Sequence, residues 1–253
     1  MKSIFFTCLL ISPILFVYSC KKDIEGCMDS SAINFNSEAT LNDNSCLFDT
    51  DGDGIYDSDE IIGCTDSLAC NFMSEATDDN NNCNYPDYGF DCNGFVTIEI
   101  GSAFQGGILF YIDSSGKHGL ISATDDFGDS KWGCNNIEII TSEILGTGFQ
   151  NTLNILEECS ETPIAASEAI SYETDEYSDW YLPSLDELKE MYFSIGVGSE
   201  LGNIGNFALN QDCRYWSSSA YEKDFAWVLN FTDLDSFGGY KPNFYNVRFI
   251  RSF

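Results

Sequence analysis

Hydrophobic and polar residues divide the chain into three stretches of different character. Residues 4–18 form a nearly continuous apolar run. Residues 23–94 carry only scattered apolar positions among many Asp, Asn and Ser side chains. From residue 95 onward, short apolar runs alternate with turn-forming residues. This last pattern is typical of many short strands with few helices, and it predicts an α+β domain.

The C-terminal stretch contains the clearest signals of secondary structure. Ser184 and Glu187 have the spacing of a capping box directly after Pro183, and apolar residues then recur at helical spacing until Gly196. A shorter helix is predicted over residues 151–159. Alternating or β-branched apolar runs predict strands, two of them joined as a hairpin by a glycine-containing turn. The predicted strands cover residues 95–100, 106–113, 118–123, 226–231 and 246–253.

The N-terminal apolar run has the organisation of a secretory signal. Lys2 precedes it, and the run is shorter than the roughly 20 apolar residues that span a membrane. It stops at Ser19, directly before Cys20, and this boundary resembles the lipobox of bacterial lipoproteins. The resemblance implies a signal peptide over residues 1–19 and a lipid on Cys20. The alternative is an ordinary secretory signal in which Cys20 is incidental.

The net charge of the chain limits the classes of molecule that it can bind. The chain has 11 basic and 41 acidic residues, a net charge of −30. Such a field repels nucleic acid and attracts divalent cations, so nucleic acid is excluded as a partner. Membrane attachment would come through the lipid on Cys20 and a short tether over residues 20–25. This tether resembles the tag that sends lipoproteins of Bacteroidota to the cell surface, which predicts an outer-membrane location.

A duplication organises the acidic stretch. Residues 26–40 read GCMDSSAINFNSEAT, and residues 63–77 read GCTDSLACNFMSEAT, an offset of 37 residues. A further cysteine follows the first cysteine of each copy after the same 19 positions, which predicts that each repeat closes its own disulfide: Cys27–Cys46 and Cys64–Cys83. Units too small for a hydrophobic core need such crosslinks. Exclusion leaves Cys70–Cys92 as a third pair. The copies resemble Cys-rich repeats of Bacteroidota surface proteins.

A twelve-residue loop between the copies has the pattern of a calcium site. Residues 49–60 read DTDGDGIYDSDE. Alternate side chains and one backbone carbonyl converge on the cation in such loops, and a glycine at position 6 permits the turn. The expected ligands are Asp49, Asp51, Asp53, Ile55 (carbonyl), Asp57 and Glu60. The neighbouring cysteines leave no room for flanking helices, so the loop resembles those of thrombospondin type 3 repeats. The alternative is a solvated acidic linker.

The C-terminal stretch carries an ordered series of motifs. GGILFYID, GKHGLI, GTGFQNT, SDWYLPSLDELKEMY, YWSSS, AWVLNF and VRFIRSF follow one another between residues 106 and 253. Together they resemble the C-terminal domain family of the Legionella collagen-like adhesin. The resemblance implies a C-type lectin-like fold related to sulfatase-modifying enzymes, and an adhesin-type role with sulfated polysaccharide as a ligand of the family. Residues 101–253 have 8 basic and 23 acidic residues, which disfavours a polyanionic ligand here.

The inventory of reactive side chains argues against an enzyme. His118 is the only histidine, and it lies at a hairpin edge. Cys134, Cys159 and Cys213 form no close-spaced motif, and Cys134–Cys159 is the favoured disulfide. Trp180 and Trp216 are assigned to the core.

Three aromatic residues are surface candidates for ligand contact: Trp132, Tyr240 and Tyr245. Arg248 and Arg251 are assigned either to a ligand or to ion pairs with acids such as Asp186 and Glu187.

The sequence therefore predicts a surface lipoprotein in which a calcium-stabilised spacer carries a ligand-binding domain. Its ligand is a glycan or a protein. The alternatives are a structural envelope component without a small ligand and, less favoured, an enzyme. The predicted parts are a signal peptide (1–19), a lipidated tether (20–25), a first repeat (26–46), a calcium loop (47–62), a second repeat (63–94) and a C-type lectin-like domain (95–253). The oligomeric state is not predicted.

Overall fold

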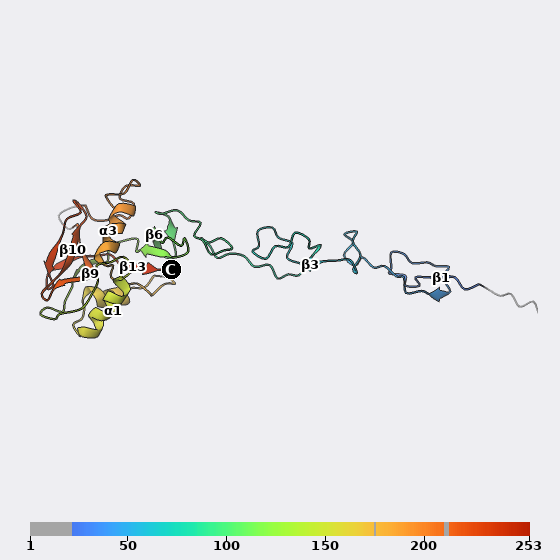
Figure 1. Cartoon of the computed structure of the whole chain (residues 1–253), viewed down its shortest axis with the longest axis horizontal. Helices are drawn as coiled ribbons and strands as arrows, with labels where there is room; N and C mark the ends of the chain where they lie inside the picture. The colour runs from blue at the N-terminus through green and yellow to red at the C-terminus, as the bar shows by residue number, and fades with distance from the viewer. Residues whose placement is uncertain (1–21, 175, 210–212) are drawn as a thin grey trace, which may run out of the picture. The chain divides into compact units, whose positions relative to one another are not determined.

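The chain forms two compact units, divided between Asn84 and Tyr85 (Figure 1). The computed structural model describes residues 22–174, 176–209 and 213–253. The predicted signal peptide over residues 1–19 and the predicted lipidation site, Cys20, lie outside these residues. The division precedes the boundary expected at residues 94 and 95, because Phe90 packs edge-on against Phe104 and Phe253 of the second unit, with ring centroids 5.8 and 5.9 Å apart. No helix in the described ranges is long and apolar enough to cross a membrane.

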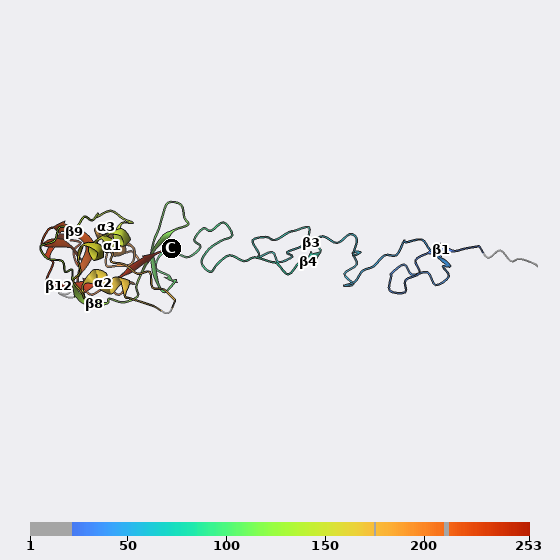
Figure 2. The same cartoon turned by 90° about the horizontal axis from the view of Figure 1, so that it is seen from below.

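The two repeats of the first unit fold alike. In the first repeat, β1 (Glu25–Gly26) pairs in parallel with β2 (Leu41–Asn42). In the second, β3 (Ile62–Gly63) pairs in parallel with β4 (Asp78–Asp79) (Figure 2). The strands of the two repeats occupy equivalent sequence positions, so the duplication in sequence is also one in structure.

Each repeat is closed by a disulfide and by one asparagine side chain. Cys27–Cys46 and Cys64–Cys83 are the pairs that the spacing predicts, each with a sequence separation of 19. Asn34 accepts a hydrogen bond from the Leu47 amide at 2.9 Å and donates to the Ser45 carbonyl at 2.6 Å. Asn71 makes the same two contacts in the second repeat, with Asn84 and Asn82 at 2.8 Å. Local crosslinks thus replace the missing hydrophobic core.

The second unit is an α+β structure built on two sheets. The larger sheet has the strand order β11-β10-β9-β12-β8, and the smaller has the order β13-β7-β6-β5. The larger sheet comprises β8 (Gly128–Lys131), β9 (Arg214–Glu222), β10 (Phe225–Asn230), β11 (Ser236–Tyr240) and β12 (Phe244–Val247). The smaller comprises β5 (Ala103–Phe104), β6 (Gly107–Ile112), β7 (Gly119–Ser122) and β13 (Ile250–Ser252). Most pairs are antiparallel, but β12 pairs with β9 in parallel.

Within the described residues, three helices accompany the sheets: α1 (Gly148–Glu158), α2 (Ala165–Ile170) and α3 (Leu185–Ser194). The predicted capping box is present at α3, where Ser184 accepts from the Glu187 amide at 3.3 Å and Glu187 accepts from the Ser184 amide at 2.6 Å. Glu187 is fully buried and also accepts from the Gly146 amide at 3.0 Å. Burial raises the pKa of this carboxyl, although its backbone donors oppose the shift. One side chain thus joins α3 to the loop before α1.

Several predicted elements need correction. Residues 95–100 form no strand and contribute only the isolated bridge between Phe90 and Val96. The run over residues 246–253 divides between β12 and β13, in different sheets, because Arg248 and Phe249 leave the ladder between them. The 106–113 and 118–123 hairpin is confirmed as β6 and β7, and the predicted strand at 226–231 corresponds to β10.

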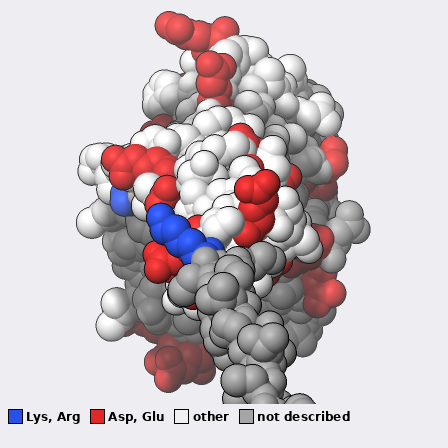
Figure 3. Space-filling view, turned by 90° about the vertical axis from the view of Figure 1, so that its right-hand side faces the viewer, with Lys and Arg blue, Asp and Glu red and all other residues white. Residues whose placement is uncertain are grey.

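The surface of the second unit is more acidic than its composition indicates. Three of its cations are buried in the core: Lys241, Arg248 and Arg251. On the face of the whole chain drawn in Figure 3, which includes residues of the first unit, acidic side chains form several separate groups and basic side chains are few. A polyanionic ligand therefore meets a field of like charge with few exposed cations to offset it.

Candidate functional site

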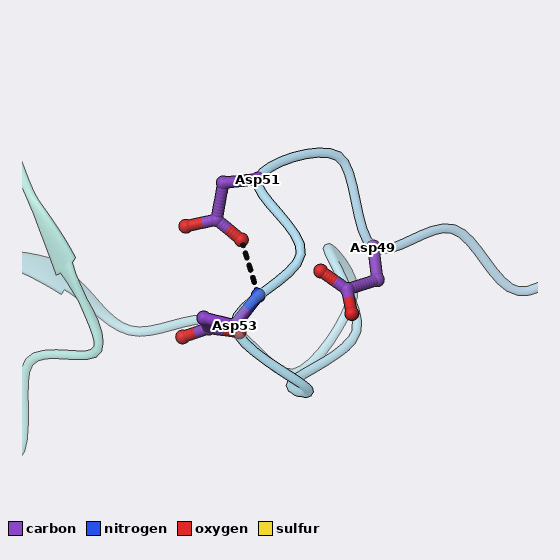
Figure 4. Close-up of side chains that lie close together, drawn as sticks. All are labelled: Asp49, Asp51 and Asp53. Carbon is purple, nitrogen blue, oxygen red and sulfur yellow. Dashed lines mark hydrogen bonds between the residues drawn. The ribbon is translucent and has the colours of Figure 1, made fainter.

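Three carboxylates converge at the start of the predicted calcium loop. Asp49, Asp51 and Asp53 each place one carboxylate oxygen within 4.8 Å of the other two (Figure 4). Asp49 is half-buried and the other two are exposed. No Lys or Arg occurs between residues 23 and 116, so the local sequence offers no cation to neutralise the group. The described residues thus contain one acidic group with the geometry to hold a metal ion.

Backbone turns bring the three side chains together. Asp49 accepts hydrogen bonds from the amides of Gly52 at 2.7 Å and Gly54 at 3.1 Å. Asp51 accepts from the Asp53 amide at 3.2 Å. Gly52 and Gly54 have φ values of +82° and +96°, a left-handed conformation that a side chain would strain. The alternation of Asp and Gly is therefore what folds the loop onto itself.

The other predicted ligands lie outside this group. Both carboxylate oxygens of Asp57 bind Thr50, the amide at 2.7 Å and the hydroxyl at 2.7 Å. These bonds, the hydroxyl one first, hold the pKa of Asp57 below its ordinary value. Glu60 shares a hydrogen bond with Asp78, and that contact is the main reason that its pKa rises to about 7. The structure therefore assembles three of the five predicted carboxylate ligands.

The residues present fit a hard cation. All the converging donors are carboxylate oxygens, which calcium and magnesium prefer, and no His or Cys joins the group. Asp57 and Glu60 follow Asp53 within the same exposed loop. A complete calcium shell has six to eight oxygens. To reach that number, the side chains of Asp57 and Glu60 and the Ile55 carbonyl would have to turn toward the ion, and water would supply the remaining ligands.

Of the three aromatic residues predicted to contact a ligand, one is buried and two are at least partly accessible. Trp132 is only 1% exposed, and its indole donates to the Ser217 carbonyl at 2.8 Å, so the expectation that it contacts a ligand is wrong. Tyr240 is 42% exposed and packs against Phe225. Tyr245 is half-buried beside Trp216, with ring centroids 4.8 Å apart. Of the three, Tyr240 offers the most accessible ring.

The arginines of the last motif form internal ion pairs. Arg248 pairs with Asp126 at 2.7 Å, and Arg251 pairs with Asp179 at 2.7 Å. The suggested partners Asp186 and Glu187 are wrong: Asp186 pairs with Lys189, and Glu187 caps α3. Both guanidinium groups are therefore committed to the fold.

The remaining cysteines are disulfide-bonded or buried, and the histidine lies at the surface. Cys134–Cys159 is formed, with both residues buried. Cys70 and Cys92 are each disulfide-bonded, and their pairing with one another stays a prediction. In the described part of the chain Cys213 is the free cysteine, buried 2.9 Å from the Asn230 side-chain oxygen. His118 is exposed, with Nδ1 3.3 Å from the Phe253 carbonyl.

Comparisons with known proteins show a distant structural likeness. No protein-family model matches the chain, and no curated protein matches it in sequence. Among solved structures, a fimbrial protein from Bacteroides ovatus ATCC 8483 is similar, with 14% identity and a TM-score of 0.39. The alignment covers 71% of this chain and 51% of that one, so this chain spans about half of the fimbrial protein.

Proposed function

We propose that the protein is a surface-anchored lipoprotein in which a calcium-stabilised, disulfide-closed spacer carries a C-type lectin-like ligand-binding domain. The observation that best supports the spacer is the convergence of Asp49, Asp51 and Asp53 between two repeats that lack cores of their own. Calcium would supply the crosslink that this loop otherwise lacks. Structural disulfides form in oxidising compartments, which supports export of the chain.

Anchoring rests on Cys20 and is tested independently of the ligand. Metabolic labelling with a fatty-acid analogue is expected to mark the wild-type protein and not Cys20→Ala. A matched control is Cys8→Ala, which removes a cysteine inside the signal and should leave labelling unchanged. Equal labelling of the Cys20→Ala variant would remove the lipid anchor from the proposal.

The ligand-binding role rests on the resemblance of the second unit to the C-terminal domain family of the collagen-like adhesin. The acidic surface supports a neutral or cation-bridged ligand over a sulfated polyanion. The test is binding of the chain to immobilised neutral glycans, heparin and extracellular-matrix proteins, with calcium and with chelator. Binding to a neutral glycan or a matrix protein supports the role. Tight heparin binding in chelator at physiological salt contradicts the charge argument.

A structural envelope component is the second candidate. The observation in its favour is that Trp132, Trp180 and Trp216 are each buried to 1% exposure or less, so these large rings are unavailable to a ligand. This candidate predicts no binding to any glycan or matrix protein, together with a loss of envelope integrity when the gene is deleted. Specific ligand binding without an envelope defect excludes it.

A further inference from the structure

A cavity of about 610 Å³ opens on the second unit between two turns. Gln105 and Gly106 form its first wall, in the turn between β5 and β6. Thr174, Glu176 and Tyr177 form the second, in a turn closed by two backbone hydrogen bonds between Thr174 and Tyr177 at 2.9 and 3.0 Å. The volume lies within the range of about 300–1,000 Å³ that is typical of small-molecule sites.

One buried cation fixes both walls. The Arg251 side chain binds Asp179 through two hydrogen bonds, at 2.7 and 2.9 Å, and is 6% exposed as a residue. A third N–H donates to the Gln105 side-chain oxygen at 2.8 Å. The guanidinium carbon also lies 4.1 Å from the centre of the Tyr177 ring. The planar guanidinium thus holds an amide from one turn and an aromatic ring from the other, so the cavity is preorganised.

The cavity keeps polar groups that the fold does not use. Because the Gln105 oxygen accepts from Arg251, the amide nitrogen is left to donate, and it has no acceptor within the described residues. The Thr174 hydroxyl is buried and likewise has no partner in the described chain. Glu176 is exposed and adds a carboxylate. The cavity thus offers an amide donor and a carboxylate acceptor to a ligand, whereas the Thr174 hydroxyl oxygen is closed off from solvent and therefore from a ligand.

The backbone at the first wall is specialised for close approach. Gly106 has φ +84°, and a Cβ there would lie 2.7 Å from Cδ2 of Tyr177 and 3.0 Å from the Thr174 hydroxyl oxygen. Gln105 also has a positive φ of 43°, which is uncommon for a residue with a side chain. Strained positions of this kind cluster at ligand sites, where they hold side chains in place.

We infer that this cavity is a carbohydrate-binding site, in which Tyr177 packs against the C–H face of a sugar ring and Gln105 and Glu176 bond its hydroxyl groups. The inference rests on the proposed ligand-binding function and adds the site and the ligand class. A polyhydroxylated neutral ligand matches a mixed set of donors and acceptors beside an aromatic ring. An anionic ligand does not, because Glu176 repels it and the charge of Arg251 is matched by Asp179.

The test uses the full chain and a panel of immobilised neutral saccharides that end in glucose, galactose, mannose, fucose or N-acetylglucosamine. Glu176→Gln is expected to weaken binding severalfold, since a neutral amide accepts hydroxyl protons less strongly. Tyr177→Leu is expected to weaken it at least tenfold by removing the ring. Because Tyr177 packs against Arg251, the thermal transition of that variant is measured beside its binding.

A glycine pair provides the matched control. Gly106→Ala places a methyl group against Tyr177 and should abolish binding. Gly146→Ala strains a backbone of nearly equal φ, +87°, but its methyl group meets no atom within 4 Å, so binding should be retained. If saccharide binding is equal in wild type, Glu176→Gln and Gly106→Ala, the site is wrong while the ligand-binding function stands. If the chain binds matrix protein and no saccharide, the carbohydrate class is wrong. If it binds neither, the proposed function fails as well.

Discussion

The ammonium group of Lys241 lies 4.4 Å from the centre of the Trp132 ring, in a part of the core where both residues are at most 1% exposed. The same group donates to the carbonyls of Ile137 at 3.0 Å and Lys223 at 2.8 Å. One charged side chain therefore ties the segment after β8 to the β9–β10 turn. Its location explains why Trp132 is unavailable to a ligand.

Lys241 should make the free energy of unfolding of the second unit vary with pH in the alkaline range. Burial lowers its pKa from 10.5 to about 8 in the folded chain. Between these values the unfolded chain binds the proton and the folded chain does not, so stability rises with pH from this group. From pH 8 to 9.5 wild type should gain about 1–2 kcal/mol relative to Lys241→Met. Urea unfolding at both pH values measures this, and parallel pH profiles would contradict it.

The Arg248–Asp126 ion pair is expected to contribute far more to the stability of the fold than the surface ion pair of Lys189 and Asp186. The Arg248 side chain is 0% exposed, whereas those of Lys189 and Asp186 are 36% and 42% exposed. Asp126→Ala leaves a buried cation without its carboxylate and should cost about 3–5 kcal/mol. Lys189→Ala should cost at most about 0.5 kcal/mol. Denaturant midpoints of the two variants provide the comparison, and similar losses would refute the distinction.

Calcium should slow proteolysis of the loop over residues 49–60. At a calcium concentration ten times the dissociation constant, which we place at roughly 10⁻⁴–10⁻³ M, cleavage should slow about tenfold because the open form is depleted. Asp49→Asn and Glu60→Gln should remove this protection. Asp59→Asn, which changes the same charge at a position outside the predicted ligand set, should preserve it. Absence of both calcium heat in titration calorimetry and protection from protease would identify a solvated linker.

The Cys134–Cys159 disulfide should stabilise the second unit and have no effect on the first. Its double replacement by alanine is expected to lower the free energy of unfolding by about 2–4 kcal/mol. The Cys27→Ala/Cys46→Ala double variant removes a crosslink from the first unit and should leave the thermal transition of the second unchanged. Non-reducing peptide mapping checks the pairs themselves, and a crosslink between Cys27 and Cys64 would overturn the repeat-by-repeat scheme.

Features that depend on nearby residues could be predicted from the sequence. The repeat disulfides follow from equal spacing within each copy, the capping box of α3 involves residues three apart, and the β6–β7 hairpin is closed by a local turn. The Asp49, Asp51 and Asp53 group follows from alternation within five residues. In each case, chain geometry alone places the interacting groups together.

Features that depend on distant residues could not be predicted. Arg248 and Arg251 pair with acids 122 and 72 residues away, and no short-range pattern distinguishes these acids from the many others. Trp132 is buried because distant segments cover it, which its own neighbours in sequence do not reveal. The cavity at Gln105 and Tyr177 could not be predicted for the same reason. Neither turn carries a recognisable motif, and the two turns are brought together by the contacts of both with Arg251.

The disulfide in each repeat also determines how the chain carries tension. Under a pull along the backbone, force passes from Cys27 to Cys46 through the covalent bridge, and the residues between them bear none of it. The 19 residue steps between the two cysteines of a repeat have a contour length of about 65 Å. Because the Cα atoms of each pair are about 5 Å apart, each bridge withholds roughly 60 Å from extension. Reduction of the disulfide would release this length in one step per repeat. The first unit would therefore be short and stiff under tension in oxidising surroundings, and longer and more compliant after treatment with a thiol.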